Sequence, residues 1–170
     1  MELKAIDLFS GCGGTTAGLK EAGINVVAAV EIDAVAAKTY KINNPEVKVF
    51  VNDICSISKK DFEDYIKESQ IMLVACPPCQ GFSTIRKNGD DDPRNQLIFE
   101  YLRLIRELKP DFLLMENVAG LIRGKGKHYF DQFSRDIQNE YEFTYSIVNA
   151  ADYGVPQKRK RLVFHGIKKH

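Results

Sequence analysis

Residues 4–14 read KAIDLFSGCGG, and in them an apolar run passes directly into a turn rich in glycine. The apolar run has the length and composition of a buried β-strand, and the spacing of residues 16–22 predicts a helix after the turn. Because glycine has no side chain, such a turn lets a ligand approach the backbone closely. This strand, turn and helix indicate an α/β fold with a site for a nucleotide-like ligand.

The glycine turn departs from the fingerprint of dinucleotide-binding proteins. Gly11 and Gly13 match its first two glycines, but Thr16 stands where the third glycine is required. The turn therefore argues against the binding of a pyrophosphate. A tight turn whose glycines serve packing alone is the alternative interpretation.

The order of strand and helix continues along the chain. Strands are expected at residues 26–30, 47–51, 71–75, 112–115, 143–148 and 161–166, and helices at residues 34–43, 61–67, 96–108 and 128–140. Residues 76–94 have the composition of a loop, and so long a loop in a compact domain is commonly functional. The alternation predicts a Rossmann-like α/β fold with a mostly parallel sheet, helices on both faces, and ligands at the carboxyl ends of the strands.

Length and composition fit one domain of this kind. The chain has 170 residues, 44% of them hydrophobic, which is enough for one sizeable core. Its net charge of +1 neither requires nor excludes a nucleic-acid partner. No apolar run approaches the roughly 20 residues that cross a bilayer, and the N-terminus does not resemble a signal sequence, so we expect a soluble intracellular protein. The four cysteines are expected as free thiols.

Chemically distinctive side chains follow five of the expected strands, and they are Phe9, Glu31, Asp53, Cys79 and Glu116. Parallel strands share one carboxyl edge, so these residues should gather along one rim. Glu31 follows Gly11 by 20 residues, where an acid can accept hydrogen bonds from ribose hydroxyls. Asp53 could reach an adenine amino group. Either acid alone is more often a solvated loop residue, but together they indicate an adenosine pocket.

The segment Cys76-Pro77-Pro78-Cys79 allows several interpretations. A zinc site is disfavoured because no second pair of Cys or His has suitable spacing, so no metal site is expected. A redox pair fits the spacing but lacks the helix start that lowers the pKa of a thiol. Two interpretations remain. Cys79 is a nucleophile held by rigid prolines, or it is an inert thiol.

Two further features concern charge. Glu116 follows an apolar strand, where desolvation would raise its pKa and allow it to donate a proton to a ring nitrogen at neutral pH. A capping or surface role is its alternative. Residues 158–161, KRKR, are locally basic and could face phosphates or form a solvated surface.

Four blocks of the sequence resemble signature blocks of the carbon-5 cytosine DNA methyltransferases, in the order found in that family. They are residues 7–14, DLFSGCGG; 77–83, PPCQGFS; 116–118, ENV; and 157–161, QKRKR. Residues 152–156, DYGVP, are similar to the family as well. The resemblance extends from about Lys4 to Gly166. It implies the fold of methyltransferases that use S-adenosylmethionine, with DNA as partner.

The resemblance also implies catalytic roles. Cys79 would attack carbon 6 of a flipped-out cytosine while Glu116 contacts ring nitrogen 3, so that carbon 5 accepts the methyl group of S-adenosylmethionine. Arg159 and Arg161 would hold the cytosine, its neighbouring phosphate or the catalytic loop.

By the same resemblance, residues at several strand ends would contact the cofactor. Phe9 would pack on the adenine, Glu31 would bind the ribose, and Asp53 and Ile54 would flank the adenine. The remaining contacts would come from Gly11, Gly13, Gly14, Ile32, Pro78 and Leu97.

Two features depart from the family pattern. Cys76 stands three residues before the nucleophile, where the family usually has glycine. It could crowd the pocket, but we expect it only to replace one small residue by another. Family members continue beyond the position of His170 into a target-recognition region and a last helix that completes the cofactor site. A second polypeptide or a missing C-terminal region would supply both. Residues 1–170 would then form one catalytic domain, nearly inactive alone and truncated or split relative to the family.

Two other functions compete with a DNA (cytosine-5-)-methyltransferase. A catalytically inactive, cofactor-binding fragment would keep the fold, although the intact Cys79, Glu116, Arg159 and Arg161 argue against it. A tRNA-directed branch of the family shares the nucleophile and the acid but tends to have threonine at the position of Ser83, so DNA is the preferred substrate. A bacterial or archaeal member would be cytoplasmic and associated with the nucleoid.

Overall fold

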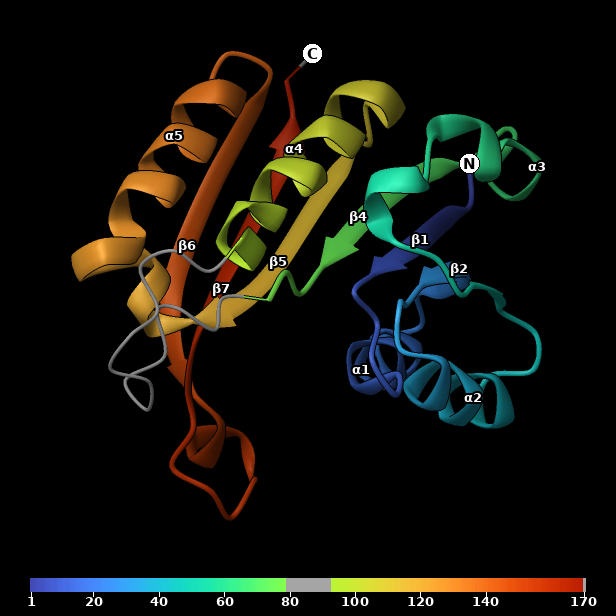
Figure 1. Ribbon diagram of the computed structural model, residues 1–170, viewed down its shortest axis with the longest axis horizontal. Helices are drawn as coiled ribbons and strands as arrows, with labels where there is room; N and C mark the ends of the chain where they lie inside the picture. The colour runs from blue at the N-terminus through green and yellow to red at the C-terminus, as the bar shows by residue number, and fades with distance from the viewer. Residues whose placement is uncertain (79–92, 170) are drawn as a thin grey trace.

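The computed structural model describes residues 1–78 and 93–169, and within these ranges seven strands form one sheet (Figure 1). The strands are β1 (Leu3–Leu8), β2 (Asn25–Val30), β3 (Lys48–Phe50), β4 (Gln70–Ala75), β5 (Phe112–Val118), β6 (Tyr141–Asn149) and β7 (Lys160–Lys168). Their order across the sheet is β3-β2-β1-β4-β5-β7-β6. Strands β1 to β5 pair in parallel, whereas β7 is antiparallel to both of its neighbours. The mostly parallel sheet predicted from the sequence is confirmed.

Helices lie on both faces of this sheet, as predicted. The α-helices are α1 (Gly14–Glu21), α2 (Ala34–Asn43), α3 (Glu63–Ile66), α4 (Leu97–Leu108) and α5 (Lys127–Ile137). The short 3-10 helices are η1 (Ile54–Ser56), η2 (Lys59–Asp61), η4 (Pro93–Gln96), η5 (Ala119–Ile122), η6 (Gly124–Gly126) and η7 (Ala150–Tyr153). Within the described ranges, no helix is long and apolar enough to cross a membrane.

Two hydrophobic cores form because successive strand residues point to opposite faces. In one core, residues of α1 and α2 such as Leu19 and Tyr40 pack on Ala29 and Val74. In the other core, α4 and α5 pack on the alternate residues of the strands, among them Leu113. Helix α4 is strongly amphipathic: its buried residues are Ile98, Tyr101, Leu102, Leu104, Ile105 and Leu108. This spacing of three and four residues is why its sequence predicts a helix.

The hairpin of β6 and β7 determines the geometry at the end of β5. Strand β7 pairs with the whole of β5, from Phe112 opposite Ile167 to Val118 opposite Arg161. The strand expected at residues 112–115 therefore extends to Val118, and Glu116 lies within it instead of after it. The pairing with β7 is the physical cause, because it gives the backbone beyond residue 115 a partner.

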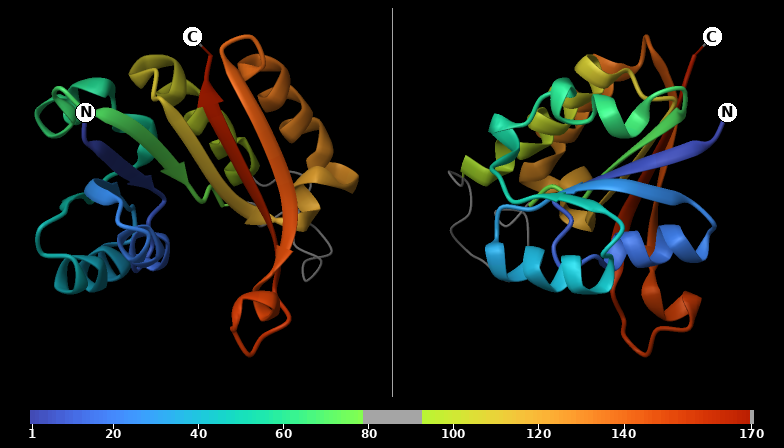
Figure 2. Two further views of the ribbon diagram at one scale, coloured as in Figure 1. Left: turned by 180° about the vertical axis from the view of Figure 1, so that it is seen from behind. Right: turned by 90° about the vertical axis from the view of Figure 1, so that its right-hand side faces the viewer.

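Strands β5, β7 and β6 carry helices on one face only. Figure 2 (left) shows their other face, which no helix of the described residues covers. Residues that alternate with the buried core residues point to this face, and several are apolar or weakly polar. They are Phe112, Leu114, Val163, His165 and Ile167. Ile167 is 47% exposed, so this part of the sheet leaves apolar surface in contact with water.

Candidate active site

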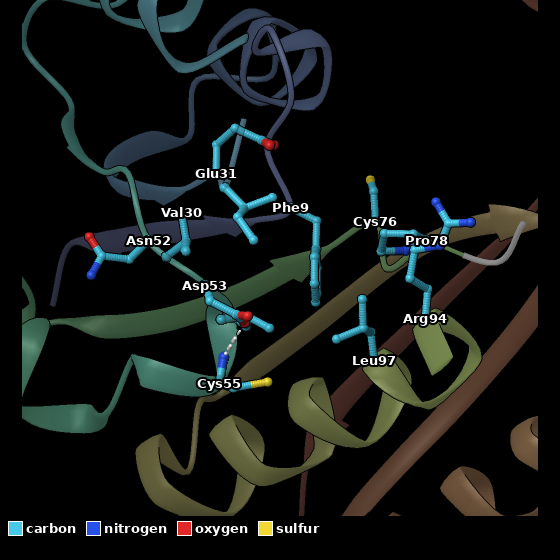
Figure 3. Close-up of a pocket in the computed structure, with 12 residues that line it drawn as sticks. Phe9, Val30, Glu31, Asn52, Asp53, Cys55, Cys76, Pro78, Arg94 and Leu97 are labelled. Carbon is cyan, nitrogen blue, oxygen red and sulfur yellow. Dashed lines mark hydrogen bonds between the residues drawn. The ribbon is translucent and has the colours of Figure 1, made fainter. Parts of the chain in front are cut away.

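A pocket of about 480 Å³ lies where the carboxyl ends of the first four strands meet the start of α4 (Figure 3). Its lining includes seven of the residues predicted to contact a cofactor: Phe9, Glu31, Ile32, Asp53, Ile54, Pro78 and Leu97. The lining also includes five residues that were not predicted to contact a cofactor: Val30, Asn52, Cys55, Cys76 and Arg94. Most of these five adjoin a predicted residue at a strand end, which is the signal that could have found them.

Phe9 enters the pocket from an unusual backbone conformation. Its φ of 57° lies in the left-handed region, which costs an L residue about 1 kcal/mol or more. The turn is held by the N–H of Ser10, which donates to the carbonyl of Val30 at 3.0 Å. Because glycine would relieve the backbone strain, the aromatic ring at this position points to a role in the pocket.

The glycines of the turn lie near the pocket but do not line it. The N–H of Gly11 donates to Oε2 of Glu31 at 2.7 Å, so this glycine supports a pocket residue. Gly13 has a φ of 95°, and a Cβ there would lie 3.0 Å from the Tyr40 ring. Gly14 begins α1 with open space at its Cβ position. The packing interpretation therefore describes Gly13, and a direct cofactor contact by the three glycines stays a prediction.

Glu31 presents a fixed carboxylate to the pocket. Its Oε2 accepts from the N–H of Gly11 at 2.7 Å, and its Oε1 accepts from the N–H of Asp33 at 2.8 Å. Each carboxylate oxygen has about two lone pairs, so both keep a place for a further donor. Two neighbouring hydroxyls, such as those of a ribose, fit this arrangement.

Asp53 and Ile54 form a second wall of the pocket. Oδ1 of Asp53 accepts from the N–H of Cys55 at 2.9 Å and thereby caps η1 (Figure 3). Asp53 is exposed and Ile54 is buried, so the wall offers a polar edge beside an apolar surface. An adenine base has these two properties, a polar edge and an apolar face.

Glu116 and Arg161 meet across the pairing of β5 with β7. Nε of Arg161 lies 2.9 Å from Oε1 of Glu116, and both side chains are only partly exposed. Burial raises the pKa of Glu116, while the positive charges of Arg161 and Arg159 act in the opposite direction. The raised pKa expected from the sequence is confirmed in direction and cause.

Arg159 lies at the base of an exposed turn and is not among the residues that line the pocket. Its backbone N–H donates to Oδ1 of Asn149 at 3.0 Å, and residues 151–160 are all exposed. This turn between β6 and β7 projects beyond the sheet (Figure 1, orange to red). Both predicted arginines act on the Glu116 carboxyl: Arg161 contacts it directly, and the positive charge of Arg159 also lowers its pKa.

The predicted nucleophile, Cys79, lies outside the described residues, as does Ser83. The segment that leads to it is described, and Asn117 holds it in place. Nδ2 of Asn117 donates to the carbonyl of Pro77 at 3.0 Å, and Asn117 is buried. Sequence reasoning gave Asn117 no role, although an amide in an apolar strand next to Glu116 was a signal that it makes a specific contact.

The cysteines of the described residues, Cys12, Cys55 and Cys76, are free thiols. Sγ of Cys76 lies 3.3 Å from Oγ1 of Thr15, and burial raises the pKa of this thiol to about 12. Cys76 is therefore protonated at neutral pH. In residues 1–78 and 93–169, no group of three or more His, Cys, Asp or Glu is placed to hold a metal ion.

Comparisons with known proteins identify the family of this chain. The family described as C-5 cytosine-specific DNA methylase matches residues 3–170. The chain is 40% identical to the type II methyltransferase M.DdeI of Desulfomicrobium norvegicum, over 98% of this chain and 41% of that protein. It is 39% identical to the type II methyltransferase M.AquIA of Picosynechococcus sp., over 98% of this chain and 72% of that protein.

A solved structure is similar to this chain over nearly its whole length. A prophage-encoded protein of E. coli, described as a DNA modification methyltransferase, superimposes with a TM-score of 0.86 and 37% identity. The match covers 98% of this chain and 47% of that chain. The chain thus spans less than half the length of M.DdeI and of the E. coli protein.

Proposed function

Since the chain belongs to the family of C-5 cytosine-specific DNA methylases, we propose that it carries the catalytic and cofactor-binding part of an enzyme that methylates carbon 5 of cytosine in DNA. One observation carries the proposal: a pocket with adenosine-like chemistry and the Glu116–Arg161 pair lie at the same end of the sheet. Residues 1–170 would act as a single domain. A DNA-modifying protein of this kind would work at the nucleoid of its cell.

The pocket suits S-adenosylmethionine, which this family uses as methyl donor. Glu31 would accept hydrogen bonds from the ribose hydroxyls, because both of its carboxylate oxygens are already oriented by backbone donors. Phe9 and Ile54 would pack on the adenine, with Asp53 at its polar edge. Bound there, S-adenosylmethionine supplies an electrophilic methyl group.

The protein's own part in the reaction would begin at Cys79. Its thiolate would form a bond to carbon 6 of a cytosine turned out of the duplex, while the Glu116 carboxyl holds ring nitrogen 3. The bond makes carbon 5 nucleophilic. After methylation, carbon 5 loses its proton and the bond between sulfur and carbon 6 breaks, which returns the thiolate. The role of Cys79 is proposed from its sequence block, and Asn117 supports it by holding the backbone two residues earlier.

Arg161 would orient the acid. Its Nε contacts one carboxylate oxygen of Glu116 at 2.9 Å and leaves the other oxygen for the base. The guanidinium also limits how far burial raises the pKa of Glu116. Arg159, on the exposed turn, would contact phosphate instead.

The complete activity would require the region by which relatives exceed this chain. We propose that this region, carried by the same polypeptide or by a second one, packs on the uncovered face of β5, β7 and β6. The partly exposed apolar residues of that face, Ile167 among them, support this placement. Sequence recognition on DNA would come from the same region.

The test is methyl transfer from labelled S-adenosylmethionine by the chain together with the region that completes it. We expect 5-methylcytosine in DNA, little transfer by the chain alone, and a loss of about 10²-fold or more in Glu116→Gln. Transfer to tRNA and not to DNA would contradict the choice of substrate. Cofactor binding without any transfer by the complete protein would favour an inactive cofactor-binding fragment.

A further inference from the structure

Arg103 connects two elements through one guanidinium group. Its Nε donates to Oε2 of Glu100 at 2.8 Å and its Nη1 to Oε1 of Glu107 at 2.7 Å, both within α4. Its Nη2 donates to the carbonyls of Ile54 at 3.0 Å and of Ile57 at 2.9 Å. The side chain is 31% exposed, so these contacts are partly shielded from water. A residue of α4 therefore holds the backbone at both ends of η1.

The segment that Arg103 holds is a wall of the pocket. Asp53, Ile54 and Cys55 line the pocket, and η1 is only three residues long. Its internal hydrogen bonds are those of a short 3-10 turn, from the N–H of Ser56 to Asp53 and from Ile57 to Ile54. Such turns have poorer hydrogen-bond geometry than α-helices, so the position of η1 depends on contacts from outside.

An ordinary ion pair on a helix surface does not account for these contacts. Pairs three and four residues apart, such as those of Arg103 with Glu100 and Glu107, stabilise many exposed helices. The two bonds of Nη2 instead reach carbonyls 49 and 46 residues away in the sequence. Glu107 takes part as well, because its Oε2 accepts from the N–H of Lys59, just beyond η1.

We propose that Arg103 is a positioning residue for the adenosine end of the pocket. By holding the carbonyls of Ile54 and Ile57, it fixes Asp53 and Ile54 where an adenine would meet them. The planar guanidinium carries five N–H donors in a fixed fork, so it can bind two carboxylates and two carbonyls together. Lysine has a single nitrogen and cannot reproduce the fork. The inference rests on the proposed function, because it takes the ligand to contain an adenosine.

The test compares Arg103→Met and Arg103→Lys with Arg106→Met, each in the chain together with the region that completes it. Arg106 lies on the same helix and is 56% exposed, with one long contact to Asp136 at 3.4 Å, so it is a matched control for the loss of charge. Two ligands are titrated by calorimetry: S-adenosylhomocysteine and 5′-methylthioadenosine, which lacks the amino-acid part. Amide hydrogen exchange at residues 55–57 reports on the segment without any ligand.

We expect Arg103→Met to lower the binding affinity for both ligands by the same factor, about tenfold. The affinities of Arg103→Lys should lie between those of Arg103→Met and the wild type. The amides of residues 55–57 should exchange faster in Arg103→Met, and Arg106→Met should match the wild type in all measurements. Should Arg103→Met not fold, Arg103→Lys decides alone by the same comparison.

The inference would be overturned if the Arg103 variants bound both ligands and exchanged their amides as the wild type does. It would also be overturned if Arg106→Met lost as much ligand affinity as Arg103→Met. A completed wild-type protein that binds neither ligand would count against the proposed cofactor pocket, and with it against this inference. Binding by the wild type that is unchanged in the Arg103 variants would reject the inference alone.

Discussion

Gly13 shows at the scale of one residue how the turn before α1 is built. Its φ of 95° and its close approach to the Tyr40 ring both exclude a side chain. Gly18, four residues into the helix that follows, has open space around its Cβ position. Alanine at these two positions should therefore change the stability of the protein in opposite directions.

We expect Gly13→Ala to lower the free energy of unfolding by about 1–3 kcal/mol, because the new methyl group meets Tyr40 in a strained backbone conformation. Gly18→Ala should raise it by about 0.5–1 kcal/mol, since alanine favours a helix interior. Urea denaturation of both variants checks the pair. A Gly13→Ala variant as stable as the wild type would contradict the packing role.

Asp7 is a buried acid beneath the same turn. Its Oδ2 accepts from the hydroxyl of Thr16 at 2.7 Å, and the Thr16 oxygen in turn lies 2.6 Å from the Tyr40 hydroxyl. Burial raises the pKa of Asp7 from the ordinary 3.8 to about 7. At a pH between 3.8 and about 7, Asp7 holds its proton in the folded state more than in the unfolded state. The contribution of Asp7 to stability is therefore greatest near pH 4 and declines as the pH rises toward 7.

The variant Asp7→Asn removes this dependence while keeping an oxygen for Thr16. We expect the stability of the wild type, relative to that of Asp7→Asn, to fall by up to about 1.4 kcal/mol per pH unit between about pH 4 and pH 7. Urea denaturation across that range measures the difference. A difference that is constant with pH, or that grows in favour of the wild type, would contradict an acid with a raised pKa.

At the scale of elements, the pairing of β5 with β7 creates the contact between Glu116 and Arg161. The two residues are far apart in the sequence, and they meet because β7 runs antiparallel beside β5. Burial and the arginines act on the Glu116 carboxyl in opposite directions. The pairing of β5 with β7 thus brings to the Glu116 carboxyl a cation that opposes the effect of burial on its pKa.

Removing the charge in Arg161→Met should raise the pKa of Glu116 further, because the carboxylate loses its nearest cation. Lys158→Met, on the exposed turn of the same hairpin, should leave it unchanged. Carbon-13 NMR titration of the Glu116 side chain distinguishes the two. A pKa that falls, or stays constant, in Arg161→Met would show that the ion pair does not act on the acid.

Local patterns predicted the elements well where one periodicity dominates. The helix expected at residues 96–108 is α4 at Leu97–Leu108, and the glycine turn lies between strand and helix as expected. The direction of β7, the extension of β5 to Val118 and the bonds from Arg103 to η1 were not predicted. Each depends on contacts between segments distant in the sequence, which no local spacing encodes.

At the scale of the whole molecule, the chain is one sheet with an unequal cover of helices. The seven predicted cofactor residues of the pocket come together because parallel strands end at one edge, which explains why they could be found from the sequence. The uncovered face of β5, β7 and β6 could not be predicted from the sequence, because it depends on the order of the strands in the sheet. We propose this face as the place where the further region of the relatives packs, since the chain spans less than half the length of M.DdeI and of the E. coli protein.

The most direct test is covalent capture on DNA that contains 5-fluorocytosine, with S-adenosylmethionine and the completed protein. Fluorine at carbon 5 prevents the final loss of a proton, so the bond between sulfur and carbon 6 persists. We predict one adduct, located by mass spectrometry at Cys79, absent from Cys79→Ser and retained in Cys12→Ser. An adduct of undiminished yield in Cys79→Ser would contradict the account.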